Sequence, residues 1–349
     1  MIAALDLGCS EFRSLRREDQ RLIARRMPAV YTVVDDLPVN RKALEQSHIP
    51  YSTTCGSLVV IGDAAIEVSM LLSRPLVPLL RGGRLADQDP IGRQVCAWLV
   101  ELLLPAAPDE NSYCLMTLPR GEVHAPGADG WTAEFLQHIV QLQGYQTTVL
   151  SPSTALALAE LEDCEFSGIC MSIGAESVHF GVMHQSQPLI ESRLLKGSRE
   201  IVEDFAHSRK RYLWDQEGNA FLNLPHIYHW LSQEEISLLQ PRSPDEEWLS
   251  EAYAELLLST MFSVKRKLQS CQDPLLQRPL PVVLSGGPVR LSGFSGLVEE
   301  AIKLTSLPVQ ISGVRAAAFE PYSIARGLLI HGTLMAGELV DAMPALEAA

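Results

Sequence analysis

Residues 1–10 read Met-Ile-Ala-Ala-Leu-Asp-Leu-Gly-Cys-Ser, an apolar run that ends in an acid, a glycine and two small residues. A short apolar run bounded by a breaker predicts a β-strand that leads into a turn. Backbone amides in such a turn can approach phosphate oxygens, and the Asp6 carboxylate can hold Mg²⁺ through water. Because ordinary strand exits share this pattern, a phosphate site here depends on agreement from the rest of the chain.

A second turn of this kind lies at residues 172–178, which read Ser-Ile-Gly-Ala-Glu-Ser-Val. Short predicted strands flank it on both sides. Gly174 and Ala175 are predicted to pass close to a phosphate. Glu176 brings a negative charge to the same turn, and would repel a phosphate if its side chain faced inward.

The third turn, residues 285–288, reads Ser-Gly-Gly-Pro and follows the apolar run 281–284. Gly286 and Gly287 offer bare backbone against which a base or a ribose can lie flat. Arg290 follows closely and is placed to stack on an adenine face.

Helical segments separate these strands. Residues 92–104 and 131–142 carry apolar side chains at helical spacing, and the strand and helix pattern begins again after residue 151. A long helical stretch is predicted at 198–213. Residues 209–248 are richer in aromatic, charged and Pro residues, which favours an inserted subdomain there. The pattern is that of an α/β protein.

The bulk composition limits the partners. A chain of 349 residues with 47% hydrophobic content can bury a large core, in about two lobes. The net charge of -14 opposes binding to nucleic acid and to anionic membranes. No apolar run reaches the ~18 residues of a membrane span, and the start lacks a signal-peptide pattern. The 7 Cys show no C-x-x-C spacing and indicate reduced thiols. We expect a cytoplasmic protein with no nucleic-acid partner and no direct membrane anchor.

In order and spacing, the three turns resemble the first phosphate loop, the second phosphate loop and the adenosine loop of the actin/Hsp70/MreB-like ATPase superfamily. The first turn is similar to that family's D-L-G-T-x string, with Cys9 and Ser10 at the last two positions. Further similar strings lie at 61–65, which matches Hsp70, at 81–87, which is similar to MreB, and at 151–159 and 322–327. The resemblance extends over almost the whole chain.

This resemblance implies an α/β, actin-like ATPase fold with two related ribonuclease-H-like lobes around a nucleotide cleft. Lobe I is expected at 1–152 plus 321–349, with an inserted subdomain at roughly 30–85. Lobe II is expected at 153–320, with an inserted subdomain at roughly 200–250. The implied site binds ATP or ADP, with Mg²⁺ held by Asp6 through water. Its implied nucleotide-binding residues are Asp6, Gly8, Cys9, Ser10, Gly174, Ala175, Ser177, Gly286, Gly287 and Arg290.

The second phosphate loop departs from the family pattern. The family opens this loop with an Asp that orients Mg²⁺, whereas this chain has Ser172, and two of three glycines are Ala175 and Glu176. No residue that positions the attacking water is evident, and Glu122 and Glu134 are the candidates within reach. Because hydrolysis in this fold depends on several groups around the γ-phosphate, we expect a weak ATPase at most.

Three functions stay open at this point. The chain is a conformational switch or MreB-like assembly protein that binds nucleotide and then self-assembles or docks a protein partner. Alternatively, it is a small-molecule kinase of the sugar-kinase type with the same fold. The third alternative is a pseudo-ATPase that serves as an interaction platform without nucleotide, against which the retained Asp6, Gly286 and Gly287 argue.

Overall fold

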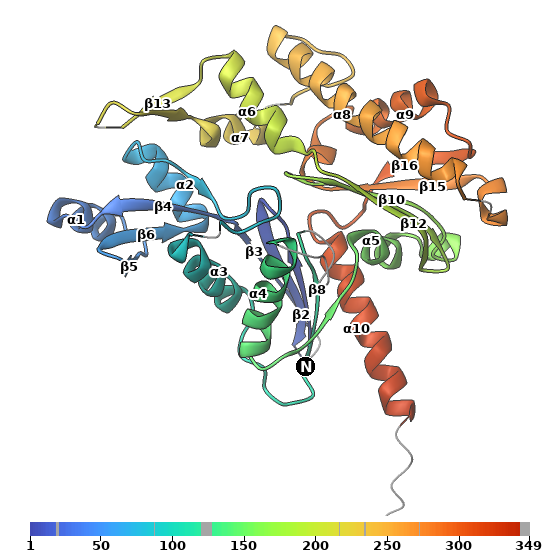
Figure 1. Cartoon of the computed structure of the whole chain (residues 1–349), viewed down its shortest axis with the longest axis horizontal. Coiled ribbons are helices and arrows are strands. Elements are labelled where there is room, and N and C mark those ends of the chain that lie inside the picture. The colour runs from blue at the N-terminus through green and yellow to red at the C-terminus, as the bar shows by residue number, and fades with distance from the viewer. Residues whose placement is uncertain are drawn as a thin grey trace, which may run out of the picture.

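Two five-stranded sheets carry the fold and share one strand order. The computed structural model describes residues 1–18, 21–86, 88–119, 128–215, 217–233, 235–271 and 273–342. The first sheet has the order β3-β2-β1-β8-β9, and the second has the order β12-β11-β10-β15-β16. In each, three antiparallel strands are followed by two parallel ones. We call the two sheets, with the helices that cover them, lobe I and lobe II (Figure 1).

The sheet of lobe I is built from the beginning of the chain. Its strands are β1 (Ile2–Leu7), β2 (Glu11–Glu18), β3 (Arg21–Pro28), β8 (Tyr113–Thr117) and β9 (Gln146–Val149). The central strand β1 is apolar at successive positions because both of its faces are covered. Ala3, Leu5 and Leu7 point to the side of α3 (Pro90–Leu103) and α4 (Ala128–Leu142). Ala4 points to the opposite side, towards α10 (Ser323–Ala342).

Lobe II repeats this construction. Its strands are β10 (Gly168–Ile173), β11 (Val178–His184), β12 (Gln187–Leu194), β15 (Leu280–Ser285) and β16 (Ile311–Ala316). One face packs against α6 (Ser198–Ser208), α8 (Pro244–Gln269) and α9 (Phe294–Thr305). The other face is covered by α5 (Pro152–Glu160), whose Leu156 meets Cys170 and Val283. The predicted actin-like α/β architecture is confirmed by this repeat of one sheet topology.

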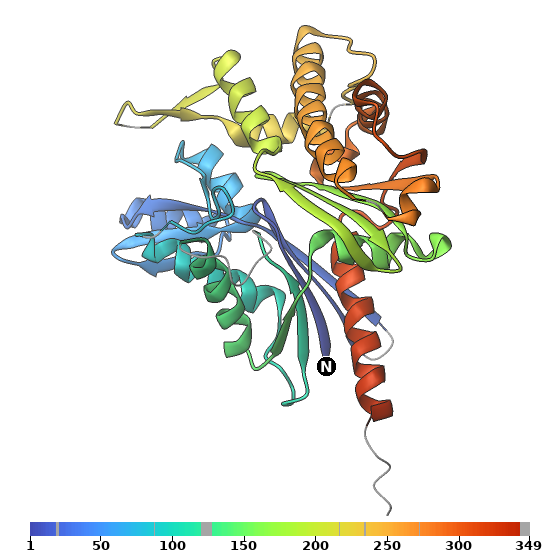
Figure 2. The same ribbon diagram turned by 45° about the vertical axis from the view of Figure 1, so that its right-hand side comes forward.

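A small region extends each lobe. In lobe I, four strands pair in the order β5-β6-β4-β7. They are β4 (Val30–Asp35), β5 (Ser52–Thr54), β6 (Ser57–Ile61) and β7 (Val77–Pro78), with α1 (Pro38–Gln46) and α2 (Gly62–Leu71). In lobe II, the hairpin β13 (Tyr212–Trp214) and β14 (Ala220–Leu222) is followed by α7 (Leu224–Gln233). Both regions lie on the same side of the molecule (Figures 1 and 2). Short 3-10 turns complete the chain: η1 (Glu162–Cys164), η2 (Pro274–Gln277) and η3 (Gly287–Arg290).

The prediction of a long helix over 198–213 is wrong for its last residues. Helix α6 stops at Ser208, and Lys210 has a φ of 53°, in the left-handed region that ends helices. The chain then pairs with β14 as strand β13, where Tyr212 and Trp214 suit a strand. Among the described residues, no helix is both long and apolar enough to cross a membrane.

Candidate functional site

The first two predicted turns are hairpin turns of the same shape in the two lobes. The Gly8 N–H donates to the Glu11 carbonyl at 3.1 Å, between β1 and β2. The Gly174 N–H donates to the Ser177 carbonyl at 2.9 Å, between β10 and β11. The two turns therefore occupy equivalent positions in the two sheets.

All three turns open onto one cleft with a volume of about 840 Å³. That size lies within the range of ~300–1,000 Å³ typical of small-molecule sites. Every residue predicted for the nucleotide site lines this cleft: Asp6, Gly8, Cys9, Ser10, Gly174, Ala175, Ser177, Gly286, Gly287 and Arg290. Positions 280 residues apart in sequence are thus gathered by the matching ends of the two sheets.

A charged row lies at the lobe I side of the cleft. The strand pairing sets Asp6 opposite Arg13, and Arg13 opposite Arg26. The buried Asp6 carboxylate accepts a hydrogen bond from the Thr117 hydroxyl at 2.6 Å and faces the Arg13 Nη1 at 3.2 Å. Glu11 completes the row, because its carboxylate lies 2.7 Å from the Arg13 Nε and 3.5 Å from the Arg26 Nη1. The Asp6 carboxylate is therefore engaged through both of its oxygens.

The equivalent row of lobe II has no carboxylate. The strand pairing sets Ser172 opposite His179, and His179 opposite Arg193. The His179 Nε2 lies 3.2 Å from the Ser177 hydroxyl. Burial lowers the pKa of His179 to about 4, and the nearby charge of Arg193 acts in the same direction. The imidazole is therefore neutral at pH 7 and can accept a hydrogen bond or a proton.

The charge of Glu176 is compensated inside the protein. Its carboxylate Oε1 lies 2.9 Å from the Nε of Arg199, and the Arg199 Nη2 donates to the Cys9 carbonyl at 2.8 Å. The sequence predicted repulsion of a phosphate on the condition that Glu176 faced inward. Its ion pair with Arg199 reduces that repulsion.

The two glycines of the third turn have different surroundings. A Cβ on Gly286 would lie 2.1 Å from the Ile173 carbonyl oxygen, and its φ is 116°. Only a glycine allows β15 to end this close to the second turn. A Cβ on Gly287 would meet no atom within 4 Å, so this backbone is open to the cleft. These two roles fit a turn that both closes the sheet end and leaves room for a ligand.

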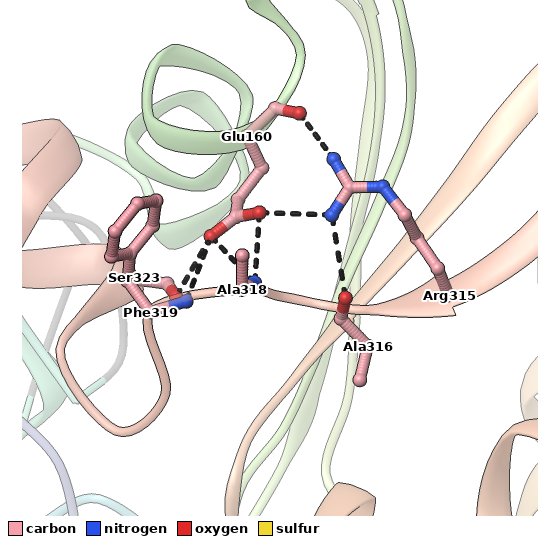
Figure 3. A network of polar contacts seen from close by, with 6 residues as sticks. All are labelled: Glu160, Arg315, Ala316, Ala318, Phe319 and Ser323. Carbon is pink, nitrogen blue, oxygen red and sulfur yellow. Dashed lines mark hydrogen bonds and ion pairs between the residues drawn. The ribbon is translucent and has the colours of Figure 1, made fainter.

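The segment between β16 and α10 forms another wall, and a buried carboxylate holds it in place. Glu160 accepts hydrogen bonds from the Ala318 N–H at 2.9 Å, the Ser323 hydroxyl at 3.0 Å and the Arg315 Nη1 at 2.9 Å (Figure 3). Burial alone would raise the pKa of Glu160, but these hydrogen bonds outweigh it and lower the pKa. The fixed segment places Glu320 in the cleft, where it accepts from the Gly286 N–H at 3.3 Å.

Comparison with known proteins agrees with this geometry. Residues 1–332 match the protein-family model described as Volactin. The chain belongs to the Volactin family. No curated protein matches this Volactin family member.

Solved structures share its fold at low sequence identity. MreB 5 of Spiroplasma citri bound to AMPPNP aligns with a TM-score of 0.68 and 12% identity, over 98% of each chain. The MamK double helical filament aligns with a TM-score of 0.66 and 16% identity, over 98% of this chain and 99% of MamK. The ethanolamine utilization protein EutJ from Carboxydothermus hydrogenoformans aligns at 0.50 and 15% identity, over 94% and 88%. These matches confirm the predicted actin- and MreB-like fold of this Volactin family chain.

Of the two predicted catalytic acids, Glu134 and Glu122, the structure describes only Glu134. Glu134 lies exposed on α4 and does not line the cleft. Glu122 falls outside the residues that the structure describes. Sequence reasoning missed Arg13 and His179, although a common signal was present. Each lies seven positions after the second-last residue of the preceding strand, Asp6 or Ser172, so the two hairpins carry the same spacing.

The cleft fits a nucleotide better than a metal ion held by protein alone. In the described ranges, no group of three His, Cys, Asp or Glu side chains could hold a metal. Asp6 already contacts Thr117 and Arg13. A Mg²⁺ ion therefore fits only with most of its ligands from phosphate and water, and Asp6 is the side chain that would contact its water.

Proposed function

We propose that this Volactin family protein binds ATP or ADP in the cleft and acts as a nucleotide-dependent assembly protein of the actin type. The observation that carries this proposal is the convergence of two matching hairpin turns and a Gly-Gly turn on one cleft of about 840 Å³. Turns of this kind present backbone amides to phosphate oxygens. The kinase and the platform alternatives have no comparable support.

Charges on the lobe I side suit the phosphates. Arg13 and Arg26 line the cleft beside the first turn. Guanidinium groups bind phosphate oxygens through paired donors, so these two residues complement the turn amides. Mg²⁺ would enter with the phosphates and contact Asp6 through water. The base would lie against Gly287 and Arg290, at the open backbone of the third turn.

Hydrolysis is proposed to be slow, with His179 as the residue that orients water. Its neutral imidazole lines the cleft beside Ser177 and can accept a hydrogen bond from an attacking water. Ser172 supplies no charge to a metal, so the γ-phosphate has fewer stabilising groups than it would with an acid there. A weak ATPase is the expected outcome.

Self-assembly is proposed from the similarity to a filament. The MamK double helical filament aligns with 98% of this chain, and MreB 5 was solved with AMPPNP. We propose that the nucleotide-bound form assembles with further copies or docks a protein partner, in the cytoplasm.

The first experiment is a thermal-shift titration with ATP, ADP and AMPPNP, with and without Mg²⁺. A nucleotide at ~100 times its Kd should add ~2.7 kcal/mol to the free energy of unfolding. Absence of any shift at millimolar nucleotide would contradict nucleotide binding. Light scattering and electron microscopy with each nucleotide then test assembly, and a monomer under every condition would contradict it.

A further inference from the structure

The N-terminus of α6 is joined to the second turn through its backbone. The N–H groups of Ser198 and Arg199 donate to the carbonyls of Gly174 at 3.0 Å and Ala175 at 2.9 Å. The approach is so close that a Cβ on Gly197 would lie 2.2 Å from the Ala175 carbonyl oxygen. The second turn and the start of α6 therefore move as one unit.

The Arg199 side chain leaves this unit and crosses to lobe I. Its Nη2 donates to the Cys9 carbonyl at 2.8 Å, although the two residues are 190 positions apart in sequence. Arg199 is 6% exposed. A charged hydrogen bond in such a place contributes more than an exposed ion pair does. An ion pair also joins the lobes, between Arg81 and Glu203 at 3.5 Å, but its arginine side chain is 65% exposed, so its contribution is small.

Glu176 holds the guanidinium at the crossing point. Its carboxylate lies 2.9 Å from the Arg199 Nε, so one side chain bridges the second turn and the backbone of the first. Glu176 also lines the cleft. Its negative charge faces the place where phosphates would lie. Without the compensating charge of Arg199, it would repel them.

We infer that Arg199 is a positioning residue with two roles. It fastens the two phosphate turns together without nucleotide, and it screens Glu176 from a bound phosphate. The fastening role follows from the contacts alone, whereas the screening role rests on the proposed nucleotide site. Closure of the lobes at the phosphate turns is therefore built into the chain, and a nucleotide enters a cleft whose floor is already assembled.

Small-angle X-ray scattering tests the fastening role on the full chain. Measured on the monomer fraction from size-exclusion chromatography, the wild-type protein should have the same radius of gyration with and without AMPPNP, and Arg199→Met should have a larger one without it. The matched control is Arg209→Met. Arg209 lies at the other end of α6 and pairs with Asp245 at 2.6 Å, both in lobe II. An unchanged radius of gyration in Arg199→Met, or an equal increase in Arg209→Met, would contradict the fastening role of Arg199.

Nucleotide affinity tests the screening role. Arg199→Met should weaken AMPPNP binding by about tenfold to a hundredfold, the range of a charged hydrogen-bond partner. Adding Glu176→Gln should restore most of the affinity while the radius stays large. A merely structural role would leave the double variant as weak as the single one.

Arg199→Lys keeps the inference testable if Arg199→Met does not fold. A lysine retains the charge but lacks the planar fork that reaches both Glu176 and Cys9. It should retain AMPPNP affinity and show the larger radius. If the wild-type protein binds no nucleotide at all, the proposed function fails. The scattering comparison without nucleotide still tests the fastening role of Arg199.

Discussion

The two hairpins at the cleft have the same backbone arrangement but carry different side chains. Lobe I sets Asp6, Arg13 and Arg26 in one row across its strands, and lobe II sets Ser172, His179 and Arg193 in the equivalent row. The first row is charged and paired within itself, whereas the second offers a hydroxyl and a neutral imidazole. The same strand pairing therefore carries a carboxylate with two guanidinium groups in lobe I, and a hydroxyl, a neutral imidazole and one guanidinium group in lobe II.

The lobes also differ where the next parallel strand ends. Strand β8 ends at Thr117 and is followed by Leu118 and Pro119, whereas β15 ends at Ser285 and is followed by Gly286 and Gly287. Replacing Gly286 by Ala should lower the free energy of unfolding, because it disturbs lobe II at this point. The added Cβ would lie 2.1 Å from the Ile173 carbonyl at a φ of 116°, which should cost about 2–4 kcal/mol.

Urea unfolding measures this cost, and Gly287→Ala is the matched control. Gly287 has open space at its Cβ, so the control should lose less than ~1 kcal/mol. It should weaken nucleotide binding instead, because a methyl group would narrow the cleft. Equal destabilisation of the two variants would contradict the difference between these neighbouring glycines.

A change of Asp6 to Asn tests the charged row. The variant keeps the shape of the side chain but removes the ion pair with Arg13, which should cost about 2 kcal/mol in urea unfolding. Ser172→Ala, at the equivalent position of lobe II, should cost less than ~0.5 kcal/mol. If the serine variant lost as much as the asparagine variant, the two rows would be energetically alike.

Between pH 7 and 5, the change in stability with pH should come mainly from His179 in lobe II. The pKa of His179 is lowered to about 4 in the folded protein, so between pH 6.5 and 4 the unfolded chain binds more protons at this residue. This contribution to stability is complete at pH 7 and is lost as the pH falls, by about 1–2 kcal/mol at pH 5.

Urea unfolding curves at pH 7, 6 and 5 measure this loss of stability. The test variant is His179→Gln, and the control is Arg13→Met. The glutamine variant should lose less stability on acidification than the wild-type protein does. The methionine variant should retain the wild-type pH dependence, because an arginine does not titrate in this range. A wild-type slope in the His179 variant would show that another group is responsible.

The smallest effect concerns Mg²⁺. Because Asp6 is the side chain expected to contact the Mg²⁺ water, chelation of Mg²⁺ by EDTA should weaken ATP binding by about tenfold or less. Ser172→Asp would supply an equivalent acid in lobe II and should make the EDTA effect larger. Titration calorimetry of both proteins compares them, and a stronger metal dependence in the wild-type protein would be the contrary result.

Local sequence was enough to predict the turns and their order. Asp6, Gly174 and Gly286 each stand at a strand end where composition changes abruptly, and such changes are local signals. Arg13 and His179 could have been found only from strand register, which sets the residue that lies opposite a strand end. The contact of Arg199 with Cys9 had no local signal, because these residues are 190 positions apart and meet only through the packing of the two lobes.

The last helix of the structure also has a consequence for synthesis. Helix α10 brings Ile324, Ala325 and Leu328 against Ala4 and Leu115, so the first sheet gains this cover from residues more than 200 positions later. On the ribosome, the part of this face that α10 covers stays exposed until α10 emerges. Exposed apolar sheet faces favour aggregation, and chains are made at ~5–20 residues per second. The first lobe to begin folding is therefore the last to be completed.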